Sequence, residues 1–167
     1  MPLLDLLRPV SDEELRVLSE RNPGWQFERL ADGRLIVSPT GGESGRIRAA
    51  VLGPLYRWNE ARGLGVVFDA STGFKLPDGS VLAPDAAFLL GKRWQALSQE
   101  AREGFPPLAP DAVFEVRSRS QGLEELRVSI GKQVGRESPP VVRNKHHLLS
   151  RRSIGLNGLL QPCNHLD

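Results

Sequence analysis

The sequence has little of what secreted and membrane proteins depend on. Its 167 residues contain one cysteine, Cys163, which excludes an internal disulfide framework and a zinc site built from cysteine thiolates. No run approaches the roughly 18 consecutive apolar residues that a membrane-spanning helix needs. The opening residues also lack the basic stretch and cleavage site of a secretory signal. We therefore expect a soluble, cytoplasmic protein that makes no membrane contact.

The charge of the chain is unevenly distributed. The length suits one domain, and the net charge is only +2. However, residues 1–125 hold 15 Lys/Arg against 18 Asp/Glu, whereas residues 126–167 hold 7 against 2. Such a basic end is typical of an arm that binds nucleic acid, or of a segment of foreign composition.

Local patterns predict an alternation of helices and strands. Ser11 and Glu14 form a capping box that begins a short helix. A D-G turn between two strand-like runs predicts a β-hairpin, and helical spacing predicts the main helix from Glu43 to Gly63. The order predicts an α/β fold, with a mixed β-sheet flanked by helices. The remaining predicted elements are strands at 65–69, 72–76, 81–89 and 111–118 and a short helix at 94–103.

Two acidic residues stand in stretches that should be buried. Asp85 lies in the strand-like run 81–89, and Glu115 stands between Phe114 and Val116. Burying a carboxylate is unfavourable unless it is paired. Carboxylates brought together from two strands are typical ligands of a hard divalent cation, so this pair predicts a metal site.

The acids belong to an ordered set of motifs. Pro84-Asp85 on one strand and Glu115-Val116-Arg117 on the next resemble the PD-(D/E)XK nuclease superfamily. The surrounding segments look like the Uma-type putative restriction endonuclease domain, over about residues 9–127. These segments are WQFERLADGRLIVSP, RGLGVVFD, LPDGSVLAPDAAF and PPLAPDAVFEVRS.

This resemblance implies a restriction endonuclease-like fold that hydrolyses phosphodiester bonds of DNA with Mg²⁺, for which Mn²⁺ substitutes. Asp85 and Glu115 match the two metal-binding acids of the family. The carbonyl of Val116 is expected to complete the coordination, and Glu28 matches an upstream glutamate on the first hairpin. By analogy with nucleases that cut two strands, the resemblance also implies a homodimer.

The cationic residue of the expected site differs from the family pattern. Arg117 stands where the motif usually has lysine, and arginine offsets charge but does not act as a base. Relatives often supply a lysine from the following helix, at a position that aligns with Ser129. Lys132, one turn later on the same helix face, is a candidate substitute. The predicted catalytic residues are therefore Glu28, Asp85, Glu115, Arg117 and Lys132.

The end of the chain departs further from the family. From about residue 128 the sequence lacks the family's C-terminal helix and strand. We interpret 1–127 as the nuclease-like domain and 128–167 as an atypical, weakly ordered tail that is read in a shifted frame or has been replaced. The alternative to an active endonuclease is an inactive remnant that keeps the fold and at most binds nucleic acid.

Each candidate acid also has a purely structural explanation. Asp85 suits a turn at the end of a strand, and Glu115 suits an ion pair with Arg117 or Arg119. Glu28 suits a pair with Arg34 across the hairpin. These alternatives stay open on the sequence alone.

Overall fold

The computed structural model describes residues 3–4, 8–39, 41–116, 141–142 and 148–150. Their elements, in chain order, are β1 (Leu3–Leu4), α1 (Asp12–Arg21), β2 (Trp25–Arg29), β3 (Leu35–Pro39), α2 (Gly42–Arg62), β4 (Gly65–Asp69), β5 (Phe74–Lys75), β6 (Val81–Leu82), β7 (Ala86–Leu90), α3 (Gly91–Gln95), α4 (Gln99–Glu103), β8 (Ala112–Val116), β9 (Val141–Val142) and β10 (Leu148–Ser150).

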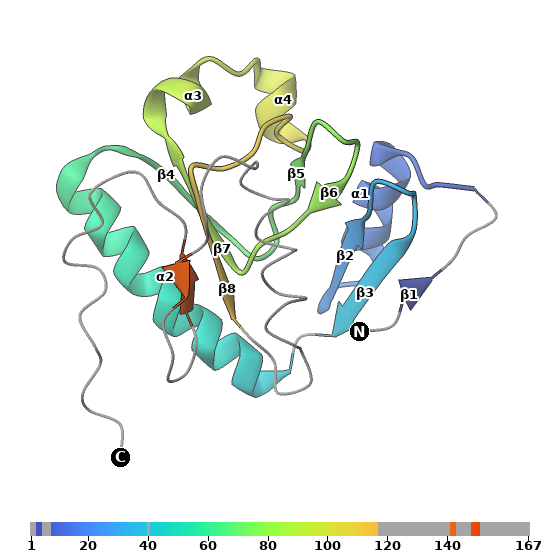
Figure 1. Ribbon diagram of the computed structural model, residues 1–167, viewed down its shortest axis with the longest axis horizontal. Coiled ribbons are helices and arrows are strands. Elements are labelled where there is room, and N and C mark those ends of the chain that lie inside the picture. The colour runs from blue at the N-terminus through green and yellow to red at the C-terminus, as the bar shows by residue number, and fades with distance from the viewer. Residues whose placement is uncertain (1–2, 5–7, 40, 117–140, 143–147, 151–167) are drawn as a thin grey trace.

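The described strands form two sheets. The hairpin sheet has the order β1-β3-β2-β6-β5, and the central sheet has the order β4-β7-β8-β10-β9. All of these pairings are antiparallel. Figure 1 shows α2 along the central sheet and α1 beside the β2–β3 hairpin. The predicted α/β class with flanking helices is confirmed, whereas the predicted single mixed sheet corresponds to two sheets whose described pairings are all antiparallel.

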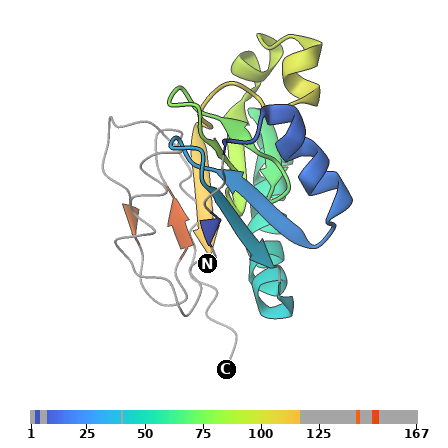
Figure 2. The same cartoon turned by 90° about the vertical axis from the view of Figure 1, so that its right-hand side faces the viewer.

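The predicted tail, 128–167, lies outside the described residues except for β9 and β10. These two short strands extend the central sheet beyond β8, as Figure 2 shows from the side. The division of the chain at residue 127 stays a prediction.

The capping box and the hairpin form as predicted. The backbone N–H of Ser11 donates to Glu14 Oε2 over 2.8 Å, and the backbone N–H of Glu14 donates to Ser11 Oγ over 3.1 Å. Strands β2 and β3 pair in the register that sets Phe27 opposite Val37. The helix and the hairpin therefore arise from local signals.

Helix α2 also ends where the sequence predicts. Its chain leaves the helix at Gly63 with a φ of 59°, and the Gly63 N–H donates to the carbonyl of Asn59 over 2.7 Å. A left-handed backbone of this kind strongly favours glycine. The helix runs through Pro54 without interruption. Within the described ranges no helix, α2 included, has the length and apolar character to cross a membrane.

Two predicted elements are each divided, and both predictions need correction. The run 81–89 forms two strands, β6 in the hairpin sheet and β7 in the central sheet. Pro84 lies between them, and proline has no N–H to contribute to a strand ladder. The predicted helix at 94–103 is likewise two short helices, α3 and α4, because Ser98 caps the second by accepting from the N–H of Ala101.

Alternate residues of the central strands face two different cores. One core lies between α2 and the central sheet, where Trp58 and Phe88 pack edge to face with ring centroids 5.3 Å apart. The other lies between the two sheets. Because side chains alternate along a strand, the odd-numbered positions of β7 and β8 face the hairpin sheet. The intersheet core contains Phe74, Leu76, Leu82, Ala87 and Val113.

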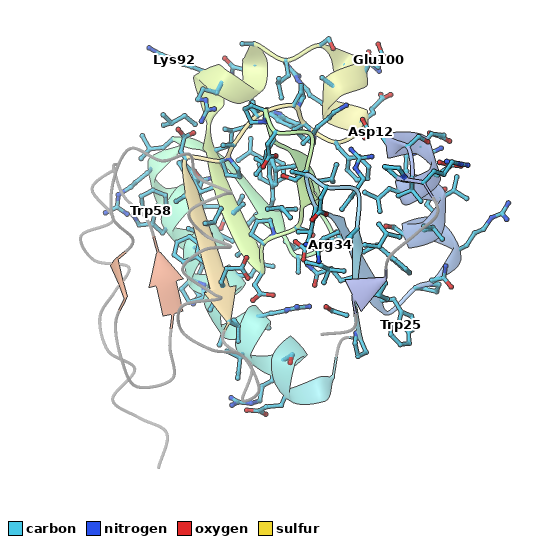
Figure 3. The ribbon with its side chains drawn as sticks, turned by 45° about the vertical axis from the view of Figure 1, so that its right-hand side comes forward. Asp12, Trp25, Arg34, Trp58, Lys92 and Glu100 are labelled. Atoms are coloured by element: carbon cyan, nitrogen blue, oxygen red, sulfur yellow. The ribbon has the colours of Figure 1, made fainter. Side chains whose placement is uncertain are left out.

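A buried arginine ties α1 to the hairpin sheet. Arg29, 8% exposed, donates to the carbonyls of Val10 and Gly79 over 2.7 and 2.9 Å. It also forms an ion pair of 2.7 Å with Asp12, which lies at the start of α1 (Figure 3). Lys75 of β5 contacts the same carboxylate. The arginine thus fixes the helix start, strand β2 and the turn before β6 to one another.

We predict that Arg29→Met lowers the free energy of unfolding by about 3 kcal/mol, because it leaves two carbonyls and a carboxylate without their partner. Urea unfolding followed by circular dichroism measures this. Arg34→Met is the matched control, since Arg34 pairs with Asp32 at an exposed position and surface pairs contribute about 1 kcal/mol or less. Equal losses in the two variants would contradict the assigned role.

Candidate active site

The register of β7 and β8 brings the two predicted acids to one place. Ala86 lies opposite Phe114, so the next position along this register sets Asp85 opposite Glu115. The N–H of Val116 donates to Asp85 Oδ2 over 2.5 Å, which fixes the carboxylate at the end of β8. Asp85, directly before β7, and Glu115, on β8, therefore lie beside one another as predicted, although Asp85 itself stands just outside the strand. On the other side of β8, Leu149 of β10 lies opposite Glu115.

Asp85 is buried and paired with a cation. Its exposed fraction is 5%, and its Oδ1 lies 2.5 Å from Nε of Arg48, on α2. Both carboxylate oxygens are thus in contact, one with a side-chain cation and one with a main-chain N–H. This pairing compensates the lost hydration of a buried carboxylate.

Arg48 is held in turn by the hairpin sheet. Its Nη2 donates to Gln26 Oε1 over 3.0 Å, and Gln26 Nε2 donates to the carbonyl of Ala83 over 2.5 Å. Ala83 belongs to the short crossing, residues 83–85, between β6 and β7. A chain of polar contacts therefore joins β2, α2 and the crossing.

Glu28 reaches the same crossing from β2. Its Oε1 accepts from the N–H of Ala83 over 2.7 Å. The residue keeps some exposed surface, yet burial of its carboxyl raises the pKa to about 7. The hydrogen bond from Ala83 opposes this rise, the negative charge of Asp85 adds to it, and the positive charge of Arg48 lowers it.

The purely structural explanation does not hold for Glu28 and holds only in part for Asp85. The hairpin register sets Glu28 opposite Ile36, and Arg34 forms an ion pair with Asp32. A cross-strand pair with Arg34 therefore does not explain Glu28. Asp85 does lie in the turn-like crossing, but its carboxylate contacts α2 and β8 rather than its own turn.

The predicted cations cannot be placed. Arg117, Ser129 and Lys132 lie outside the described residues, as does Arg119, the alternative partner of Glu115. The roles of Arg117 and Lys132 stay predictions.

The residue types at the end of β7 and β8 fit a hard divalent cation. Asp85 and Glu115 offer carboxylates and Val116 offers a carbonyl, and Mg²⁺ is usually held by one or two carboxylates while it keeps several waters. No group of three or more His, Cys, Asp or Glu side chains suited to a metal occurs in the part of the chain that the structure describes. The donors that the described residues offer here are two carboxylates and one main-chain carbonyl.

Sequence reasoning missed Gln26 and Arg48, although each left a signal. Gln26 stands two positions before Glu28, so strand alternation puts both on one face. Arg48 shares a helix face with Val51, Leu52 and Leu55 at the spacing of an apolar stripe. A charge in such a stripe requires a partner, but the local pattern does not identify Asp85 as that partner.

A comparison with protein-family models identifies one family. A family model, Uma2, described as "Putative restriction endonuclease", matches residues 12–132, which is more than half of the chain. No curated protein matches. A solved structure of a "putative nuclease belonging to DUF820" from Anabaena variabilis is similar with a TM-score of 0.49 and 16% identity. The similarity covers 71% of this chain and 64% of that one.

The raised pKa of Glu28 predicts a pH-dependent stability. Between its ordinary value of 4.5 and about 7, the folded protein keeps a proton that the unfolded chain has released, so this group's contribution to stability falls as pH rises. Glu28→Gln stays neutral and can still accept from Ala83. We expect the free energy of unfolding of the variant to exceed that of the wild type by an amount that grows with pH. The difference should reach the order of 3 kcal/mol by pH 8 to 9.

Urea unfolding at several pH values between 5 and 9 measures the difference. Glu100→Gln, at an exposed position on α4 (Figure 3), is the control, and its stability should follow that of the wild type across this pH range. A difference between Glu28→Gln and the wild type that does not change with pH would contradict the raised pKa.

Proposed function

Since the chain belongs to the Uma2 family, we propose that it is a Mg²⁺-dependent endonuclease that hydrolyses phosphodiester bonds of DNA. The observation that carries this proposal is the placement of Asp85 beside Val116, with Glu115 at the facing position of the neighbouring strand. Two acids, one directly before β7 and one on β8, together with the main-chain carbonyl of Val116, are donors that suit a hard cation. We also propose the cytoplasm as the location.

Asp85, Glu115 and the carbonyl of Val116 would hold the metal in this proposal, with Mn²⁺ as a substitute. When bound, a divalent cation polarises the phosphoryl oxygen and lowers the pKa of a bound water. The protein's own part is to orient these ligands. Asp85 is suited to it, because the main-chain bond from Val116 restricts its carboxylate.

Glu28 is the proposed proton acceptor. A carboxyl whose pKa is about 7 exchanges protons readily at neutral pH, as general acid–base catalysis requires. In its ionised form it would take a proton from the water that attacks phosphorus, as the bond to the leaving oxygen breaks. Its hydrogen bond with Ala83 keeps one oxygen in place and leaves the other for this task.

A cation beside the acids would offset the charge of the phosphate. We propose Arg117 or Lys132 for this task; because arginine is not deprotonated in proteins, Arg117 would act by its charge alone.

One observation favours the second candidate, an inactive remnant that at most binds nucleic acid. Arg48 already neutralises Asp85, so the carboxylate is stable without a metal. The two candidates differ in whether the protein cuts DNA, and the same assay separates them.

We predict that the protein nicks supercoiled plasmid DNA with Mg²⁺ or Mn²⁺ and that Asp85→Asn and Glu115→Gln lower the rate by about 100-fold or more, because a metal ligand contributes several kcal/mol of charge stabilisation. Agarose electrophoresis of time courses measures the rate, with Glu100→Gln as control. Cleavage that survives both substitutions rules out the site. Absence of cleavage in the wild type favours the remnant, and an RNA substrate tested in parallel decides the choice of nucleic acid.

We further propose a homodimer, because cutting both strands of a duplex is most simply done by two copies of one site. Light scattering after size exclusion should then give the mass of two 18.4 kDa chains. The mass of one chain at every concentration tested would exclude the dimer.

A further inference from the structure

Arg48 occupies a position that a metal ion would compete for. We infer that Arg48 is a built-in counter-cation of Asp85, which a divalent cation must displace from the carboxylate before it binds fully. The inference rests on the proposed function, because it concerns the same carboxylate. The inference gives Arg48, a residue of α2, control over metal affinity. The family pattern of acids and a lysine includes no residue with this role.

The contacts of Asp85 leave one movable partner. Asp85 Oδ2 accepts from the N–H of Val116, a main-chain group fixed within β8, which pairs with strands on both sides. Oδ1 contacts Arg48, a long side chain from a helix. With the carboxylate only 5% exposed, an incoming cation has to take the space on the Oδ1 side. Only the arginine can leave without breaking the sheet.

Arg48 is held by a neighbouring side chain and is also partly exposed to solvent. Gln26 accepts a hydrogen bond from its Nη2 over 3.0 Å and orients the guanidinium. Gln26 is itself anchored to the carbonyl of Ala83. The Arg48 side chain nevertheless remains 22% exposed, so it has a route to solvent. Long basic side chains use such routes to keep the charged group hydrated.

The electrostatics give the sign of the effect. A guanidinium and a divalent cation at one carboxylate repel each other, and the repulsion is strong where water is excluded. The metal-bound form therefore bears a penalty that the metal-free form does not. Removing the charge of Arg48 should strengthen metal binding and, at the same time, destabilise the metal-free protein by leaving Asp85 without its counter-ion.

A merely structural role predicts the opposite result for the metal. If Arg48 only holds Asp85 in its binding position, its loss should weaken metal binding or leave it unchanged. Metal affinity therefore separates the two roles, and stability alone does not.

The test is calorimetric titration of the full chain with MnCl₂ and MgCl₂, without nucleic acid, for the wild type and for Arg48→Gln. Glutamine retains polarity and removes the charge. We expect the dissociation constant of the metal to fall on the order of tenfold in Arg48→Gln. This is the same free-energy change as a pKa shift of about one unit. Arg48→Lys, which keeps the charge, should remain close to the wild type. Arg46→Gln is the matched control, because Arg46 is an exposed arginine of the same helix that pairs with Glu43.

A second measurement keeps the test decisive if Arg48→Gln is less stable. Thermal melting should show a lower midpoint for this variant without metal and a larger rise on adding MnCl₂ than the wild type shows. Circular dichroism at low temperature checks that the variant is folded. If it is not folded, Arg48→Lys and Arg48→Met take its place, and only the uncharged Arg48→Met should bind more tightly.

The outcomes separate this inference from the proposed function. If the wild type binds metal, Asp85→Asn abolishes binding, and Arg48→Gln binds no more tightly than the wild type, the inference fails and the site stands. If neither the wild type nor Arg48→Gln binds metal, both fail. Tighter binding by Arg48→Gln that disappears when Asp85→Asn is added supports both.

Discussion

The burial of one carboxylate shapes the centre of this molecule. Asp85 gives up nearly all of its contact with water, and the loss is compensated by a main-chain N–H from β8 and a guanidinium from α2. Because these partners come from different layers, the carboxylate can be satisfied only when the helix and the sheet are correctly placed. The crossing that carries Asp85 is held from the other side by Gln26 and Glu28 of the hairpin sheet. One short segment thus connects both sheets and the main helix.

Much of the framework could be predicted from the sequence, because its signals are local. The capping box at Ser11 and Glu14 involves residues three positions apart, and the glycine that ends α2 needs only its own left-handed backbone. The pairing of Asp85 with β8 was also predictable, since two buried-looking runs that each carry an acid favour neighbouring strands. Here the family resemblance and the physical pattern agree.

The parts that could not be predicted depend on distant partners. Pro84 in the run 81–89 is a local sign of a break, but it does not show that the two halves join different sheets, which the packing of Leu82 in the intersheet core and of Phe88 against α2 decides. Likewise, the charge of Arg48 is visible in the sequence but its partner is not. The raised pKa of Glu28 results from enclosure by several elements, and no single stretch encodes it. Tertiary packing therefore determines the division of the run 81–89, the partner of Arg48 and the pKa of Glu28.

The polar contacts of the crossing also bear on the order in which the fold forms. The hydrogen bonds that Ala83 accepts from Gln26 and donates to Glu28 join residues 57 and 55 positions apart, and the bond from Val116 to Asp85 spans 31. Closing such long loops is slow compared with forming a helix or a hairpin. We expect the two hairpin strands and α2 to form early and the acidic centre to assemble late in folding. A partly folded chain would then contain the hairpin and α2 before the acidic centre has formed. The acidic centre would be complete only when the whole fold is complete.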